Sequence, residues 1–144
     1  TSKKAAPALH RTIRITNNTI DGTRTDAIQV MAWKDVQITG NTIRNVRASK
    51  RRAVLASGVG TLTFSKNRLC NVPRPLQVMG WRNTGPGKEY APLPAFLPGS
   101  GLTTSQKRAF TSNTSGGRVE ERVVSVVGSN GKRSASWTIP SGRC

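Results

Sequence analysis

The chain has 144 residues, which suits one ordinary domain, and 35% of them are hydrophobic while only 5% are aromatic. Lysine and arginine number 23 against 6 acidic residues, so the formal net charge is +17. Such an excess attracts polyanions, namely acidic glycans, nucleic acids or anionic membrane surfaces. No apolar run approaches the roughly 18–20 residues of a membrane-crossing helix, so we expect no membrane span.

Residues 1–12 are expected to form an irregular entry segment, because they are rich in basic residues and small residues and contain Pro7. No signal peptide is visible, and the chain begins at Thr1 rather than at methionine. No capping element is recognisable before Ile13 either. We therefore expect this chain to be the last part of a longer protein.

Residues 13–81 contain an internal repeat. The segments IRITNNTIDG (13–22), VQITGNTIRN (36–45) and LTFSKNRLCN (62–71) share three apolar positions and one asparagine. A second set of similar segments follows each of them: AIQVMAW (27–33), AVLASGV (53–59) and PLQVMGW (75–81). Two independent registers therefore recur with the same period.

Period-2 alternation in these segments predicts short strands with their apolar side chains inward, two strands to each repeat. One such unit cannot bury its apolar face, whereas stacked units form columns of like residues. The expected columns are Ile13, Val36 and Leu62; Ile15, Ile38 and Phe64; Ile20, Ile43 and Leu69; Ile28, Val54 and Leu76; and Val30, Ala56 and Val78.

The shared asparagines are Asn18, Asn41 and Asn67. Asparagine tolerates the left-handed backbone of a sharp corner. Its amide can also hydrogen-bond to the asparagine of the next repeat. These three residues therefore predict a structural ladder along one edge of the stack.

The pattern I-x-I-x-x-N-x-I, followed by a loop and a second apolar strand, resembles the right-handed parallel β-helix superfamily, also called pectate-lyase-like. The resemblance implies an all-β chain with about three coils over residues 13–81. The superfamily includes polysaccharide lyases, glycoside hydrolases, alginate epimerases and phage tailspikes. The scaffold carries many activities, so the resemblance bears more on fold than on chemistry.

Residues 82–117 predict an irregular excursion, because 82–101 are dense in glycine and proline, with one short helix at 103–110. Residues 118–144 predict a C-terminal β-hairpin, with strands at 118–127 and 133–140, that caps the stack. The two cysteines, Cys70 and Cys144, leave two alternatives open: one disulfide that ties down the C-terminus, or two unrelated thiols.

The loops at 21–26, 44–52 and 70–75 occupy the same place in successive repeats, so we expect them to stack. That arrangement predicts a strip of cations suited to a linear polyanion. Its members are Arg24, Arg47, Lys50, Arg51, Arg52 and Arg74. Trp33 and Trp81 stand at equivalent places and are expected to point outward, where an indole can stack on a sugar ring. The alternatives are a solvated basic face and two indoles that cover apolar corners.

No catalytic residue can be named from the sequence. The resemblance implies an arginine or lysine base with Ca²⁺ in lyases, and paired aspartates in hydrolases. Asp21 and Asp26 share one loop, but no adjacent aspartate pair occurs. His10 is the only histidine, and with two cysteines it gives too few ligands for zinc, so no metal site is predicted. No cofactor is assigned, and Ca²⁺ remains only an implication of the resemblance.

Two functions are consistent with these observations. The first is a secreted or cell-surface bacterial β-helix protein that acts on or binds an acidic polysaccharide, as a polysaccharide lyase or glycoside hydrolase would. The second is a non-catalytic adhesin or tailspike-like module. Specific nucleic-acid binding is not expected, because no known reading fold is visible and stacking aromatics are few.

Overall fold

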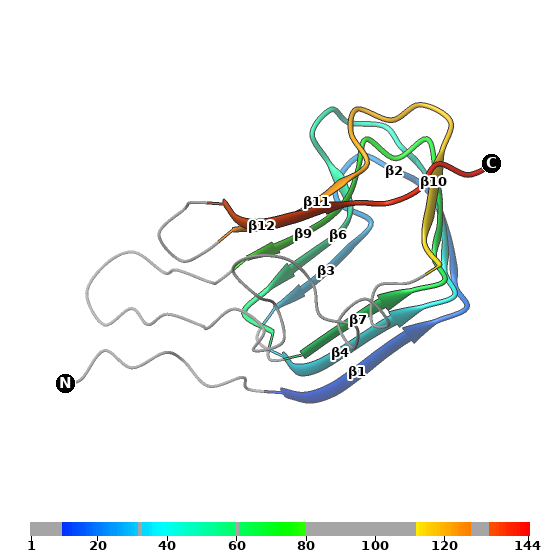
Figure 1. Cartoon of the computed structure of the whole chain (residues 1–144). Helices are drawn as coiled ribbons and strands as arrows, with labels where there is room; N and C mark the ends of the chain where they lie inside the picture. Colours follow the sequence, from blue (N-terminus) through cyan, green and yellow to red (C-terminus); the bar gives the residue numbers. More distant parts are fainter. Residues whose placement is uncertain (1–9, 32, 60, 80–111, 128–132) are drawn as a thin grey trace.

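The computed structural model describes residues 10–31, 33–59, 61–79, 112–127 and 133–144, and within these ranges the chain forms strands and no helix (Figure 1). The strands are β1 (His10–Thr16), β2 (Thr19–Thr23), β3 (Ile28–Met31), β4 (Trp33–Thr39), β5 (Thr42–Val46), β6 (Arg52–Ser57), β7 (Thr61–Ser65), β8 (Arg68–Cys70), β9 (Arg74–Met79), β10 (Thr114–Gly116), β11 (Val123–Val127) and β12 (Arg133–Thr138).

The strands belong to three sheets, with the orders β1-β4-β7, β2-β5-β8-β10 and β3-β6-β9-β11-β12. The chain visits the first, second and third sheet in turn and then returns to the first, so β1–β3, β4–β6 and β7–β9 form three successive circuits. Every pairing between circuits is parallel, and β11–β12 is antiparallel. The fold is therefore all-β with parallel sheets, an arrangement compatible with a parallel β-helix.

Each circuit contains three strands, whereas the sequence pattern predicted two. The difference arises because every ten-residue repeat bends in its middle. The first repeat, for example, gives β1 before Asn17 and β2 from Thr19 onward. The pattern was interpreted as one strand followed by a turn, but it encodes two strands on different sheets.

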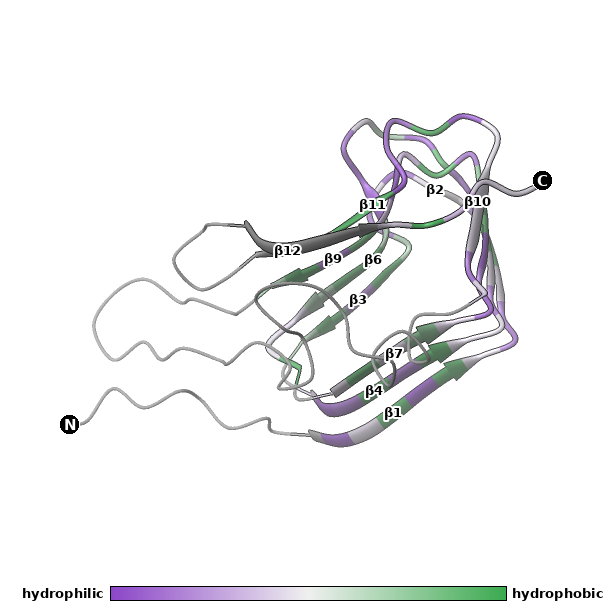
Figure 2. Ribbon diagram, viewed as in Figure 1, coloured by the Kyte–Doolittle hydropathy of each residue, from purple (hydrophilic) through white to green (hydrophobic). Residues whose placement is uncertain are grey.

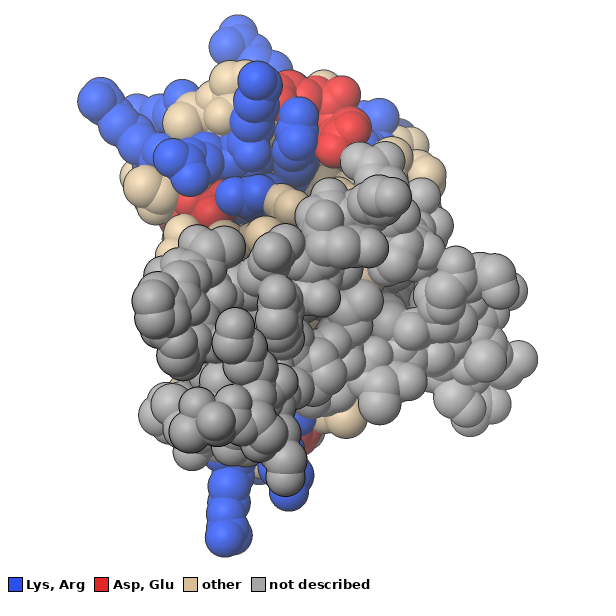
Figure 3. All heavy atoms as spheres, turned by 90° about the vertical axis from the view of Figure 1, so that its left-hand side faces the viewer, with Lys and Arg blue, Asp and Glu red and all other residues tan. Residues whose placement is uncertain are grey.

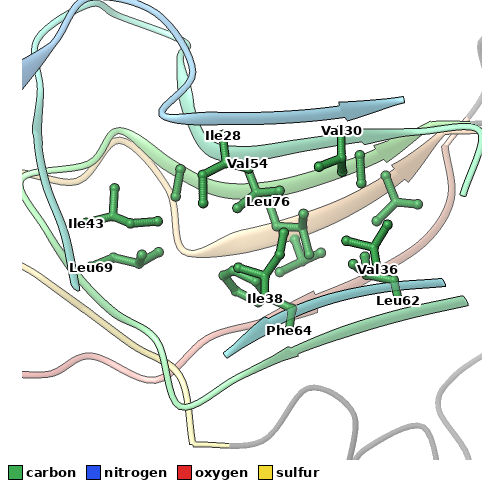
Figure 4. Close-up of a cluster of buried hydrophobic side chains, with 14 of the residues drawn as sticks. Ile28, Val30, Val36, Ile38, Ile43, Val54, Leu62, Phe64, Leu69 and Leu76 are labelled. Carbon is green, nitrogen blue, oxygen red and sulfur yellow. The ribbon is translucent and has the colours of Figure 1, made fainter. Parts of the chain in front are cut away.

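The predicted apolar columns are confirmed by the strand registers. Ile38 pairs with Ile15 and Phe64, Ile43 pairs with Ile20 and Leu69, and Val54 pairs with Ile28 and Leu76. Figure 4 shows members of these columns, among them Ile38, Phe64 and Leu76, in the space between the sheets. Figure 2 shows hydrophobic residues alternating with hydrophilic ones along the strands.

The core is filled mainly by aliphatic side chains, with Phe64 the largest that is fully buried. In the first circuit Ile13, Ile15 and Ile20 are only partly buried, whereas their partners in the second circuit are completely covered. No described strand pairs with the outer edges of β1, β2 and β3. Residues 10–12, expected to be irregular, belong to β1.

Two rows of residues with left-handed backbone conformation turn the chain from one sheet to the next. The corner between the first and second sheets has positive φ at Asn17, Gly40, Lys66 and Ser112. The corner after the second sheet has positive φ at Gly22, Asn45, Asn71 and Gly117. A left-handed residue changes the chain direction sharply, and glycine and asparagine adopt this conformation most readily. The ladder asparagines follow the first row and are not left-handed, so the conformational part of their prediction was wrong.

The hydrogen-bonding part of that prediction is confirmed. The Oδ1 atom of Asn41 accepts the backbone N–H of Asn18 at 2.9 Å, and Oδ1 of Asn67 accepts that of Asn41 at 3.0 Å. The ladder extends one step further than expected, because Oδ1 of Asn113 accepts the N–H of Asn67 at 3.1 Å. Asn41, Asn67 and Asn113 are buried, and the ladder satisfies backbone groups that the corner removes from solvent.

A partial fourth circuit follows the third. Strand β10 pairs with β8 and β11 pairs with β9, so residues 112–117 belong to the stack and not to an irregular excursion. The rest of the predicted excursion, residues 82–111 with the helix at 103–110, lies outside the described residues.

Strands β11 and β12 form the antiparallel pair expected of the predicted C-terminal hairpin, although β11 begins at Val123 and not at residue 118, and the pair extends the third sheet at one end. The final residues return to the second sheet, where the N–H of Gly142 donates to the carbonyl of Ser115 at 3.2 Å. Cys70 and Cys144 form a disulfide, which resolves the two alternatives in favour of the bridge. The end of the chain is therefore fastened to the third circuit.

Candidate polyanion-binding surface

The connections between the second and third sheets lie on top of one another, as predicted, and we call them the loop stack (residues 24–27, 47–51, 71–73 and 117–122). Their backbones are joined directly. The N–H of Arg47 donates to the carbonyl of Thr23 at 2.7 Å, and the N–H of Asn71 donates to that of Gly116 at 3.0 Å. Figure 1 shows these connections side by side above the second sheet.

Four of the predicted cations are exposed on the loop stack. Arg24, Arg47, Lys50 and Arg51 have no side-chain partner among the described residues. Figure 3 shows lysine and arginine side chains gathered over this part of the molecule, with a few acidic side chains among them. These four residues can therefore meet a ligand without first breaking an internal ion pair.

Arg52 is held by an internal ion pair instead. Its Nε lies 3.1 Å from Oδ1 of Asp26 and its Nη2 lies 3.1 Å from Oδ2, a two-point contact between adjacent circuits. Its Nη1 donates to Gln77 in the next circuit. The Asp26 side chain is fully buried. Burial alone would raise the pKa of Asp26, but the hydrogen bonds and charge of Arg52 outweigh it and hold this pKa below its ordinary value.

Arg74 also faces acids of the same chain. Its Nε lies 3.6 Å from Oε1 of Glu120 and 3.7 Å from Oε1 of Glu121. Glu120 and Glu121 reach this position because both of their backbone N–H groups donate to the carbonyl of Pro73. The six predicted cations therefore divide into four exposed residues without an acidic partner among the described residues and two, Arg52 and Arg74, that face acids of neighbouring circuits.

A cleft of about 670 Å³ opens between the second and fourth members of the loop stack. Arg47 and Ser49 line one side, Arg118 and Glu120 line the other, and Asn71 lies between them. Arg118 was not predicted. It follows Gly117, which occupies the same corner as Gly22, so the match between NNTIDG (17–22) and SNTSGG (112–117) could have revealed it.

The tryptophan prediction is corrected in one of its two positions. Trp33 begins β4, is partly buried and packs against the core, so it covers an apolar corner of the fold and does not point away from it. Trp81 lies outside the described residues. Gln29 and Met31 are the exposed residues of β3, and Met31 is 49% accessible.

The acids of the described residues are also engaged with neighbours. Asp21 accepts hydrogen bonds from Arg44 at 3.1 Å and Asn45 at 2.8 Å. Asp35, on the first sheet, accepts one from Thr61 at 2.7 Å. Within the described ranges, no three side chains of histidine, cysteine, aspartate or glutamate come together as metal ligands. The loop stack therefore exposes cations, and no catalytic residue is assigned.

None of the described segments contains a helix long and apolar enough to cross a membrane. A scan against protein-family models finds no match to this chain, and searches of curated proteins and of solved structures find no similar protein.

Proposed function

We propose that this chain is part of a right-handed parallel β-helix of the pectate-lyase-like kind, and that its loop stack binds an acidic polysaccharide. The observation that carries the proposal is the exposed set Arg24, Arg47, Lys50 and Arg51, which has no internal acidic partner among the described residues. Arg24 lies in the loop of the first circuit and Arg47, Lys50 and Arg51 lie in the loop of the second, so the four cations cover two neighbouring circuits about 5 Å apart.

Binding is better supported than catalysis. The acids that could serve a hydrolase are already committed, Asp21 to Arg44 and Asp26 to Arg52. Arginine recognises carboxylates and sulfates through paired N–H donors, and this task requires no proton transfer. The disulfide between Cys70 and Cys144 supports a secreted or cell-surface location, because disulfides persist in oxidising compartments.

The experiment compares polygalacturonate, alginate and heparin with neutral dextran, using isothermal calorimetry at two salt concentrations. Wild type is expected to bind the acidic polymers and not dextran, with weaker binding at higher salt. The variant Arg24→Ala/Arg47→Ala/Arg51→Ala should lose roughly tenfold or more in affinity, taking about 0.5 kcal/mol or more for each exposed contact.

The matched control removes the same charge elsewhere. Arg11, Lys34 and Arg68 are exposed on the first and second sheets and have no side-chain partner among the described residues. Their triple alanine variant should bind nearly as wild type does. Equal losses in the two variants would mean that net charge alone attracts the polymer, and the loop stack would have no special role. Release of unsaturated products absorbing in the near ultraviolet would instead favour a lyase.

A further inference from the structure

Glu120 occupies a compact anion site within the loop stack. Its Oε2 accepts a hydrogen bond from the Ser49 hydroxyl at 2.8 Å, and its Oε1 accepts one from the backbone N–H of Lys50 at 3.0 Å. The Nε of Arg74 lies 3.6 Å from Oε1. A hydroxyl, a backbone N–H in a turn and a guanidinium are donors of the kind that proteins present to carboxylates and sulfates.

The backbone that carries these donors is positioned without help from Glu120. Residues 48–51 form a turn, closed by a hydrogen bond from the N–H of Arg51 to the carbonyl of Ala48 at 3.3 Å. Lys50 has a φ of 64°, the left-handed conformation, in this turn. The turn is fastened to β9, because the N–H of Arg74 donates to the carbonyl of Arg51 at 3.1 Å. The backbones of Ser49, Lys50 and Arg74 are therefore held together by contacts that do not involve Glu120.

Solvent can reach the occupied site. The Glu120 side chain is 38% exposed and lines the same cleft as Arg47 and Arg118, neither of which has a side-chain partner among the described residues. An acidic group that enters the cleft would meet these two arginines beside the three donors. One carboxylate of the chain thus lies where a carboxylate of a ligand would gain the same contacts.

We propose that Ser49, Lys50 and Arg74 form a subsite for one acidic group of the glycan, and that Glu120 fills this subsite until the ligand's carboxylate or sulfate replaces it. The proposal rests on the proposed function, because it assigns a position to one acidic group of the same ligand. Glu120 is then a competitor built into the binding surface.

The test compares Glu120→Ala with Glu121→Ala, because both variants remove one negative charge near Arg74 but only Glu120 touches Ser49 and Lys50. Sodium sulfate and a methyl galacturonide are titrated into each ¹⁵N-labelled protein, and the Lys50 amide shift is followed. Glu120→Ala should bind these small anions about tenfold more tightly than Glu121→Ala, as expected for one charged hydrogen-bonding contact.

Glu120→Gln is a second variant that retains the size of the side chain and an acceptor for the Lys50 N–H. It should bind small anions more weakly than Glu120→Ala, since it still fills the site. Equal responses of the Lys50 amide in Glu120→Ala and Glu121→Ala would overturn the subsite and leave the proposed function intact. Failure of wild type to bind any acidic polymer would contradict the proposed function instead, so the two failures can be told apart.

Discussion

Replacing Asn67 with alanine is a direct test of the asparagine ladder. Asn67 is 1% exposed, and its Oδ1 accepts hydrogen bonds from the backbone and side-chain N–H groups of Asn41 at 3.0 and 3.1 Å. Its Nδ2 donates to the carbonyl of Ile38 at 2.9 Å and to Oδ1 of Asn113 at 3.1 Å. One buried amide therefore joins three circuits.

Alanine would leave the N–H of Asn41 and the carbonyl of Ile38 buried without these partners. Each unsatisfied buried group costs about 1–3 kcal/mol, so we expect Asn67→Ala to lower the free energy of unfolding by about 3–4 kcal/mol. That loss is a large fraction of the roughly 5–15 kcal/mol that ordinary domains possess.

Asn18→Ala is the control, because Asn18 is the exposed end of the same ladder and its side chain donates, among the residues that the structure describes, only to the carbonyl of Thr16. Asn18→Ala should lower the free energy of unfolding by less than about 1 kcal/mol. Urea unfolding followed by circular dichroism gives both values, with an unchanged slope if the denatured states are alike. Equal losses for the two variants would refute the view that buried amide contacts stabilise the corner.

Three further predictions concern stability. Asp26→Asn should lower the free energy of unfolding by about 3 kcal/mol at pH 7, because it leaves Arg52 without its buried anion. Since the pKa of Asp26 is lowered in the folded chain, its contribution is present above about pH 3.9 and is lost as the pH falls through the lower folded pKa. The difference in the free energy of unfolding between wild type and Asp26→Asn, measured by urea titration, should therefore close as the pH falls below about 4. A difference that stays constant with pH would count against the ion pair. Reducing the bridge between Cys70 and Cys144, 74 residues apart, should cost about 4 kcal/mol by the chain-entropy relation. A double serine variant should be insensitive to dithiothreitol, and an equal effect of the reductant on both proteins would show that it acts elsewhere. Within the described segments the buried Ser115 hydroxyl has no hydrogen-bond partner, so Ser115→Ala should raise the free energy of unfolding by about 1 kcal/mol. A loss of similar size in thermal unfolding would show that this hydroxyl has a stabilising role.

The apolar columns could be predicted because stacked parallel strands repeat the same inward positions. Ile15, Ile38 and Phe64 share one register in the sequence and in the structure. The fourth circuit was missed for a physical reason: Ser115 stands where the other circuits place an isoleucine or leucine, so the apolar signal disappears. The asparagine survives there as Asn113, and that signal alone could have extended the repeat.

The binding surface was only partly predictable. The register that aligns Ile28 with Val54 also places Asp26 beside Arg52, so this ion pair could have been inferred from the repeat. The acids near Arg74 were harder to infer, because Glu120 follows the fourth circuit, where Ser115 removes the apolar signal of the repeat. Charge alone does not distinguish a cation that fastens two circuits from one that is free to bind.

The most direct test of the central claim is hydrogen–deuterium exchange of the wild-type protein with and without polygalacturonate. The bound polymer should slow exchange in residues 23–26, 46–52 and 117–121, the segments that carry the exposed cations and the cleft. The backbone amides of the first sheet, strands β1, β4 and β7, should exchange at the same rate in both samples. Protection confined to the first sheet, or no protection in a sample that calorimetry shows to be saturated, would contradict binding by the loop stack.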